Sequence, residues 1–274
     1  MVGGRGLLIA AACWALAGTS LYATNWQVAA ARSTADIRQI PPLEPPSAAS
    51  IKALSLGFTR AAADVAWLQT IQYFGGGNPN ERYSALTALI NTVVKLDPDF
   101  EYPYQFGGII LPLQGDYEDA LKLLDAGIAR FPNNGLLPYY AGAIARIDLN
   151  DSRRAAVYFQ QAARTPGAPA AATLLAGVSL TDLDDRQIAL AWWNGIIETS
   201  SDTTIRDRAI VWRDHLETVL ALETLIIKIN AASGLPINNL QDLVTRGLLP
   251  EVPKSPLGWP LVLNTATGRV ELLR

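Results

Sequence analysis

The stretch EYPYQFGGIILPLQGDYEDALKLLDAGIARFPNN, residues 101–134, decides the fold of this chain. Ala120 and Leu124 in its second half lie four residues apart, and Gly127 comes next on the same face, because 3.6 residues make one turn of an α-helix. The small Gly108 in its first half lets a neighbouring helix approach, since packed helices lie about 8–10 Å apart. The stretch therefore predicts two helices that pack against each other.

Three prolines give this pattern a period. Pro98, Pro132 and Pro166 follow one another at intervals of 34 residues, and each closes a helix-like segment. Residues 101–134 resemble the tetratricopeptide repeat family over their whole length, and Tyr104 matches the aromatic residue of the first helix in that family. The resemblance implies helix–turn–helix units that stack into an α-solenoid, and such solenoids typically bind other proteins.

The neighbouring units are more degenerate. Pro103 fits the first turn of a helix, whereas Pro112 predicts that the first helix ends or kinks there. In the next unit the phase of the pattern slips by one residue before Pro166. The small and packing positions are Gly142, Ala155, Phe159 and Ala162 in residues 135–168; Gly177, Ala189, Trp192 and Gly195 in residues 169–202; and Ala85, Ile90 and Val93 before Pro98, paired with residues 50–75. The alternative is a generic helical array whose proline spacing arises partly by chance.

The N-terminal segment carries a second signal. Residues 6–31 hold no charge, and about 20 apolar residues suffice for a helix to cross a hydrocarbon core roughly 30 Å thick. Aromatic residues gather at membrane interfaces, where Tyr22 and Trp26 would fall. We therefore expect a single-pass membrane anchor in residues 1–31. Its apolar side chains are Leu7, Leu8, Ile9, Trp14, Leu16, Leu21, Tyr22 and Trp26.

Two other interpretations of this segment stay open. The small residues of ALAGTSLYA, residues 15–23, suit cleavage of a signal peptide, and AAAC, residues 10–13, faintly resembles a lipoprotein site acylated at Cys13. A short tail before an anchor and a large domain after it favour a tail in the cytoplasm. We therefore expect a membrane protein with the bulk of the chain in the periplasm.

Four segments follow from the composition along the chain. Residues 1–31 form the anchor, the proline-rich residues 32–50 a semi-rigid linker, residues 51–215 the helical repeats and residues 216–274 a small C-terminal α+β cap. The longest helix is expected over residues 203–232, ended by Gly234 and Pro236. The predicted fold is mainly α, with one small β-hairpin.

The cap has its own pattern. Asn238 or Asn239 caps a helix over residues 239–246 that ends at Gly247. Apolar strands are expected at Leu261–Leu263 and Arg269–Leu273, joined by a turn at Thr265–Gly268. This order, with the motif GLLPEVPKSPLGWPL at residues 247–261, resembles the C-terminal part of type II secretion major pseudopilins. No pilin leader precedes the apolar run, however, so the similarity favours a shared structural solution.

A further resemblance lies in GFTRAAADVAWLQTIQYFG, residues 57–75, which looks like the first helix of membrane-anchored tetratricopeptide proteins of diderm bacteria. Asp64, Trp67 and Gln72 carry this likeness, and some of those proteins are encoded beside pilus or exporter genes. The alternative is that Trp67 and Tyr73 are core residues and that Asp64 caps a helix or faces solvent.

The residues of catalysis are scarce in this sequence. A zinc site needs several His or Cys ligands, and a Cys–His nucleophilic pair needs Cys13 to meet His215, but these are the only cysteine and the only histidine of the sequence. His215 is expected on the surface or in a groove. The glycines of FGGGNP, residues 74–79, lack the lysine of a phosphate loop and predict a turn. The net charge of −3 gives no support to nucleic-acid binding. We expect no catalytic residue, no metal and no cofactor.

Aromatic residues are the best candidates for binding. First helices line the groove in tetratricopeptide arrays, so Tyr104, Phe106, Tyr139 and Tyr140 are candidate groove residues, ahead of Trp192. Packing between repeats is the competing interpretation for each of them. The expected function is a non-catalytic, membrane-anchored scaffold that binds protein partners and supports assembly of a membrane or envelope complex. The alternative is a pseudopilin-like subunit or an accessory protein of pilus, secretion or exporter systems.

Overall fold

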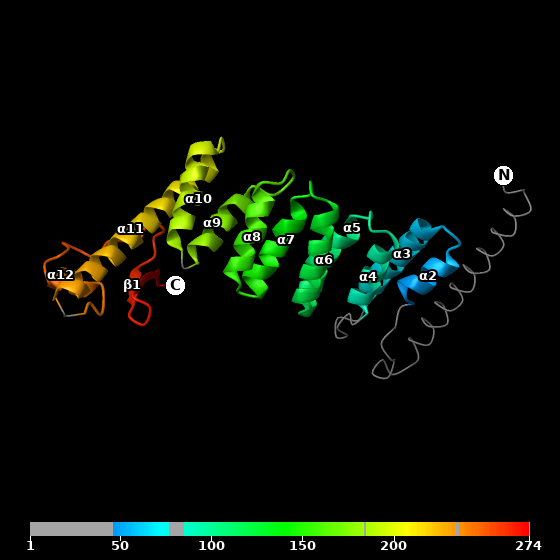
Figure 1. Cartoon of the computed structure of the whole chain (residues 1–274), viewed down its shortest axis with the longest axis horizontal. Helices are drawn as coiled ribbons and strands as arrows, with labels where there is room; N and C mark the ends of the chain where they lie inside the picture. Colours follow the sequence, from blue (N-terminus) through cyan, green and yellow to red (C-terminus); the bar gives the residue numbers. More distant parts are fainter. Residues whose placement is uncertain (1–45, 77–84, 184, 234–235, 274) are drawn as a thin grey trace, which may run out of the picture. The chain divides into compact units, whose positions relative to one another are not determined.

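The computed structural model describes residues 46–76, 85–183, 185–233 and 236–273. The expected anchor (1–31), most of the linker and part of the expected turn after Phe74 lie outside these residues. The described chain is mainly helical and ends in a two-stranded antiparallel sheet (Figure 1). Its α-helices are α2 (Ala48–Leu54), α3 (Thr59–Gly76), α4 (Leu86–Leu96), α5 (Tyr102–Ile110), α6 (Tyr117–Arg130), α7 (Leu136–Ala143), α8 (Ser152–Ala163), α9 (Ala171–Thr181), α10 (Arg186–Thr199), α11 (Thr203–Ser233) and α12 (Gln241–Thr245).

Consecutive helices form four hairpins: α3 with α4, α5 with α6, α7 with α8, and α9 with α10. These pairs are the predicted units, and each second helix also packs on the first helix of the next pair. The prolines act as expected in the best unit. Pro103 lies in the first turn of α5, and Pro112 falls in the 3-10 turn η2 (Leu111–Gln114) that follows the end of α5.

The same close contact recurs in three hairpins, where a glycine of the first helix faces a large side chain of the second. A methyl group added to Gly108 would lie 2.6 Å from Leu124, one on Gly142 2.7 Å from Phe159, and one on Gly177 2.4 Å from Trp193. At such distances an added methyl group would force the facing side chain to move, so glycine lets these helices pack closely. The predicted faces of α6 and α8 are confirmed, since Ala120, Leu124, Gly127, Ala155, Phe159 and Ala162 are all buried.

The fourth unit needs a correction. Trp193, and not the predicted Trp192, is fully buried on the inner face of α10, while Trp192 is half-buried. Gly195 has nothing within 4 Å of an added methyl group, so it does not provide a close helix contact. One residue of phase on a helix turns a side chain by about 100°, which is why the choice between neighbouring tryptophans was wrong.

The phase slip in residues 135–168 has a structural counterpart. The chain after α7 forms a π-helical turn, η3 (Ile144–Asp148), in which Leu149 N donates to Ile144 O at 3.1 Å. A π turn holds one more residue than an α turn. The extra residue between Gly142 and Phe159 is therefore accommodated without loss of their contact.

Polar contacts link each pair to the next. Tyr158 of α8 donates its hydroxyl to Asp125 of α6 at 2.8 Å, and Arg154 pairs with Glu118 at 3.0 Å. Further along, Arg146 pairs with Asp182 at 2.8 Å. Each contact joins residues 33 to 36 positions apart, which is close to the repeat period. Stacking of like units on like units produces this regular separation.

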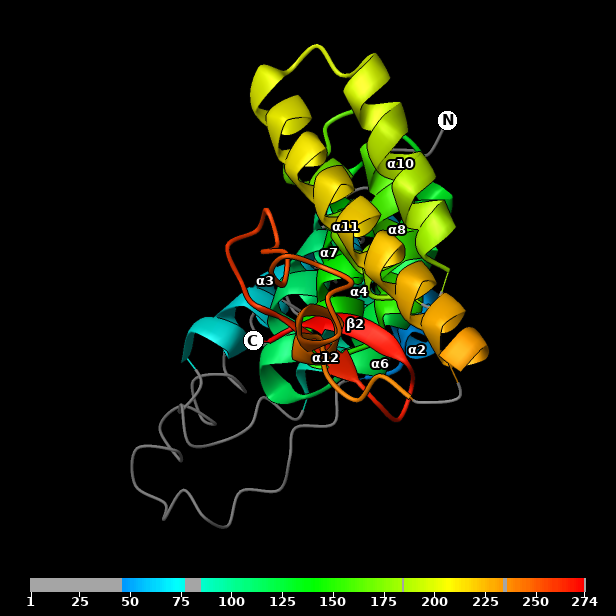
Figure 2. The ribbon, with the colours of Figure 1, turned by 90° about the vertical axis from the view of Figure 1, so that its left-hand side faces the viewer.

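The cap is built on the long helix α11, which runs antiparallel to α10 (Figure 2). The helix covers the expected 203–232 segment and runs unbroken across residue 215, so the expected boundary between repeats and cap falls inside one element. Its second half shares a core with α12 and the hairpin of β1 (Leu261–Asn264) and β2 (Arg269–Leu272), where Leu261 pairs with Leu272 and Leu263 with Val270. The buried residues of this core are Val219, Leu222, Ile226, Ile237, Leu240, Leu243, Leu261 and Val270.

Helix α12 begins at Gln241, two residues later than predicted, with Leu240 at its N-cap, and the predicted Asn239 stabilises the turn just before it. The side chain of Asn239 accepts from Asp242 N at 3.0 Å, while the Asp242 carboxylate accepts from Asn238 N and Asn239 N. These reciprocal bonds form a capping box. Gly247 follows with a φ of 70°, which ends the helix in the left-handed conformation that suits glycine. None of the helices in the described segments is both long and apolar enough to cross a membrane.

Candidate interaction surface

Tyr104, the first predicted groove residue, is 3% exposed and belongs to the core between α5 and α6. Its ring lies 5.8 Å from the ring of Phe131 and rests against Gly127, where an added methyl group would meet it at 3.0 Å. Burial raises the pKa of its hydroxyl, which donates to Pro98 O at 3.3 Å. This packing removes Tyr104 from the candidate groove.

Phe106 lies in an aromatic cluster between α3 and α5, which we define as Trp67, Phe74, Phe100, Tyr102 and Phe106. Ring centroids of Trp67 lie 5.2 Å from Phe106, 5.6 Å from Tyr102 and 5.7 Å from Phe100, all edge to face. Phe74 meets Phe106 at 5.3 Å in the same geometry. Edge-to-face pairs add about 0.5–1.5 kcal/mol each beyond burial of area. The cluster is therefore a rigid patch made by two successive first helices.

The aromatic cluster stays partly open to solvent. Tyr102 is 55% exposed, and the other four rings are half-buried. A large ring with a polar tip, held in place by neighbours, suits a residue that anchors a protein interface. In the sequence, Trp67 in residues 57–75 was the residue that pointed to this patch. Its contacts with Tyr102 and Phe106 could not be predicted, because they depend on how α3 packs beside α5.

Tyr139 and Tyr140 of α7 are both half-buried, with ring centroids 6.0 Å apart. Tyr139 lies 5.9 Å from Phe159 and packs on the core of the α7–α8 pair, while Tyr140 packs on the core of the preceding pair. Tyr140 follows Phe106 by 34 residues, so the two residues hold corresponding positions on contacting first helices. The two tyrosines and Phe106 therefore combine core packing with partial exposure.

A hollow of about 420 Å³ lies further along the chain, beside Trp192. Its wall includes Gly195, Ile196 and Ile205, and the indole of Trp192 donates to Thr173 O at 3.1 Å, which fixes the ring. The wall is more apolar than polar. Trp192 was ranked behind the tyrosines on sequence grounds, so this site was missed, and its signal was the Trp192–Trp193 pair itself.

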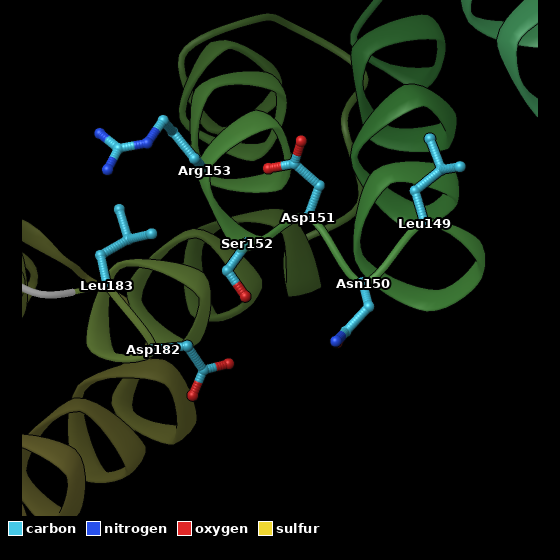
Figure 3. A pocket seen from close by; sticks show the side chains of 7 residues that line it. All are labelled: Leu149, Asn150, Asp151, Ser152, Arg153, Asp182 and Leu183. Atoms are coloured by element: carbon cyan, nitrogen blue, oxygen red, sulfur yellow. The ribbon is translucent and has the colours of Figure 1, made fainter. Parts of the chain in front are cut away.

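A larger but shallow hollow of about 680 Å³ lies at the turn between η3 and α8 (Figure 3). Residues 149–153, Asp182 and Leu183 line it. Both carboxylates are already engaged, since Asp151 caps α8 and pairs with Arg154 at 2.8 Å, and Asp182 pairs with Arg146. Among the described residues no group of three or more His, Cys, Asp and Glu side chains could hold a metal ion.

His215 was expected on the surface or in a groove, but it is only 4% exposed. Its Nδ1 lies 3.0 Å from Ser255 Oγ, and its ring meets the edge of Trp212 at 5.9 Å. Trp212 in turn stacks on the buried Trp193 at 5.8 Å. His215 thus joins α11 to the loop before the hairpin. The expectation was wrong because Ser255, which covers the histidine, lies 40 residues away in the sequence.

No protein-family model matches this chain, and no curated protein matches it in sequence. The two family resemblances noted above therefore rest on the quoted residues alone.

Proposed function

We propose that this chain is a non-catalytic, tetratricopeptide-like scaffold, anchored in a membrane by residues 1–31, that binds protein partners and supports assembly of an envelope complex. The repeated glycine contact carries the proposal. Gly108, Gly142 and Gly177 occupy the same place in three successive hairpins, and each receives the large residue of its second helix. A repeated stack of helix pairs offers extended surfaces of the kind that bind peptides and helices.

The aromatic cluster is the proposed docking surface, with Tyr139 and Tyr140 extending it. Tyr102 contributes the most exposed ring; Trp67 contacts that ring edge to face and itself packs against Phe106. Pre-arranged aromatic rings bind well because little side-chain freedom is lost when a partner docks. A membrane anchor would add to this by raising the effective concentration of the scaffold near membrane-bound partners.

The test is capture of partners from the native membrane in mild detergent, followed by mass spectrometry. Full-length chain is compared with Tyr102→Ser and with Val157→Ser, which removes an apolar side chain of similar exposure (62%) from the outer face of α8. We expect a stoichiometric partner with the parent and with Val157→Ser, and at least a tenfold loss with Tyr102→Ser, about 1.4 kcal/mol. Equal capture by both variants would place the docking surface elsewhere.

The anchor is tested separately, by deletion of residues 1–31. Release of the shortened chain from membranes supports the anchor. Retention in the membrane pellet, in a strain that lacks the captured partner, contradicts it.

A second candidate function is a pseudopilin-like structural subunit. The element order of the cap favours it, since α11 leads into a short helix and then a hairpin. Purified full-length chain that assembles into filaments, seen by electron microscopy, would support this function over the scaffold.

A further inference from the structure

The α2–α3 loop, taken together with Leu54 at the end of α2, presents three large apolar side chains to solvent. Leu54 is 81% exposed, Leu56 73% and Phe58 57%. Leu56 has a φ of 50° and Gly57 one of 93°. The left-handed conformation is unfavourable for leucine, so the surrounding structure holds this loop in a shape that the residue itself does not prefer.

The outer face of α3 continues this apolar surface. Leu68 is 61% exposed, Val65 39% and Ile71 36%, with Arg60 and Asp64 as the charged residues of the face. A stacked array needs a polar surface on its terminal unit to stay soluble. At the other end of the array the hairpin covers α11, but in the described part of the chain the loop and this face stay open.

We propose that the α2–α3 loop, with the outer face of α3, rests on a lipid bilayer, so that Leu54, Leu56 and Phe58 enter the boundary between headgroups and acyl chains. Apolar side chains of interfacial segments reach about 5–10 Å into this boundary. Lys52 and Arg60 flank the loop, where cations complement anionic headgroups; Lys52 is exposed, whereas Arg60 already lies 3.9 Å from Asp97 and 3.6 Å from Asp99. Both cations have long stems that let the charge stay in the headgroup layer.

The place of the loop in the chain favours a bilayer over a protein partner. The inference rests on the proposed anchor, which ends at residue 31, and α2 begins at Ala48. A linker of this length reaches at most about 55 Å even when fully extended. The first described helix therefore stays within reach of the membrane, where lipid is available to an apolar loop beside Lys52.

The experiment uses the full chain with Cys13→Ala, reconstituted into vesicles of phosphatidylcholine and phosphatidylglycerol. A nitroxide label is attached at Leu54→Cys, at Phe58→Cys, or at Leu113→Cys as a control. Leu113 lies in the 3-10 turn η2 after α5 and is 78% exposed, which is close to the 81% exposure of Leu54. Each label is tested for collision with oxygen, which concentrates in lipid, and with a water-soluble nickel chelate.

We expect the ratio of oxygen to nickel accessibility to be several-fold higher at positions 54 and 58 than at 113. Vesicle-bound chain with equal ratios at all three positions would overturn the inference and leave the anchor standing. Chain that fails to float with vesicles would overturn both. Spin–spin broadening at position 54 would also overturn it, because that signal means that a second copy covers the loop.

Discussion

Single glycines set the distance between helices in this protein. Gly177 lies in α9 against the fully buried Trp193, and Gly142 lies in α7 against Phe159. We expect Gly142→Ala and Gly177→Ala to lower the free energy of unfolding by about 1–3 kcal/mol each, because the added methyl group forces a large ring out of place. Urea unfolding followed by circular dichroism measures the change.

Gly195→Ala is the matched control for this prediction. Gly195 is also helical, in α10, but an added methyl group there has nothing within 4 Å. Alanine favours a helix over glycine by about 0.5–1 kcal/mol, so this variant should be slightly more stable than the parent. If all three variants behave alike, the close contacts do not limit the packing of these helices.

The carboxyl group of Asp151 is expected to make the folding stability of the chain depend on pH. Backbone and side-chain hydrogen bonds from Arg154 hold the pKa of this carboxyl below its ordinary value of 3.8. A lowered pKa in the folded state means stability that is present above the unfolded pKa and lost as pH falls through the folded one. Asp151→Asn keeps a side chain that caps α8 but removes the charge.

We therefore expect Asp151→Asn to be less stable than the parent at pH 7, by up to about 1 kcal/mol, as for a partly exposed ion pair. The difference should shrink as the pH falls from 7 towards 2.5, because Asp151 of the parent becomes protonated as the pH falls through its lowered pKa. Thermal unfolding at both pH values gives the two differences. A difference that is the same at both would mean that the charge of Asp151 contributes nothing.

At the scale of elements, the sequence predicted the helices well, because their signals are local. Pro103, Pro112 and Gly247 mark helix ends through backbone geometry, and Gly268, with a φ of 72°, lies in the predicted hairpin turn. The side chains that fill the space between elements were harder to predict. Tyr104 was predicted in the groove but is buried, because the repeat period identifies a position on a helix and does not show whether a neighbouring ring covers that position. His215 depends on Ser255, which no local pattern connects to it.

The attachment of the hairpin to the repeats is a contact between elements that the sequence did not indicate. Arg186 of α10 and Glu223 of α11 form an ion pair at 3.2 Å, with side chains 12% and 14% exposed. Both also hold β2, since Arg186 donates to Val270 O at 3.0 Å and Glu223 accepts from Val270 N at 2.8 Å. Removal of one partner leaves the other charge buried, which is strongly destabilising.

We expect Glu223→Ala to destabilise the cap by about 3–5 kcal/mol and to release β2 from α11. Glu217→Ala is the control on the same helix, since Glu217 is 56% exposed and lies 3.9 Å from Arg213, and it should change stability by less than about 1 kcal/mol. Hydrogen exchange at the Val270 amide reports the release. Protection that survives in Glu223→Ala would show that the apolar core of the cap is enough to hold β2.

At the scale of the described chain from residue 46 onward, the packing is mostly between neighbouring pairs. Stability of such an array is approximately a sum of terms for each unit and each interface. Phe159 of α8 is 1% exposed and lies in the middle of the series, between the α5–α6 and α9–α10 pairs. Removal of the Phe159 side chain weakens the contact between the helices before α7 and those after α8, while each of these two groups keeps its own core.

Phe159→Ala should therefore cost about 3–5 kcal/mol locally and split unfolding into two transitions, with α4 to α6 and α10 to α12 exchanging amide protons independently. Leu243→Ala in α12 is the control, because Leu243 is fully buried at one end of the series and its loss should loosen the cap first. Hydrogen exchange in stepped urea separates the outcomes. A single cooperative transition in Phe159→Ala would mean that contacts beyond nearest neighbours hold the array together, and the description of this chain as a stack of repeats would have to be given up.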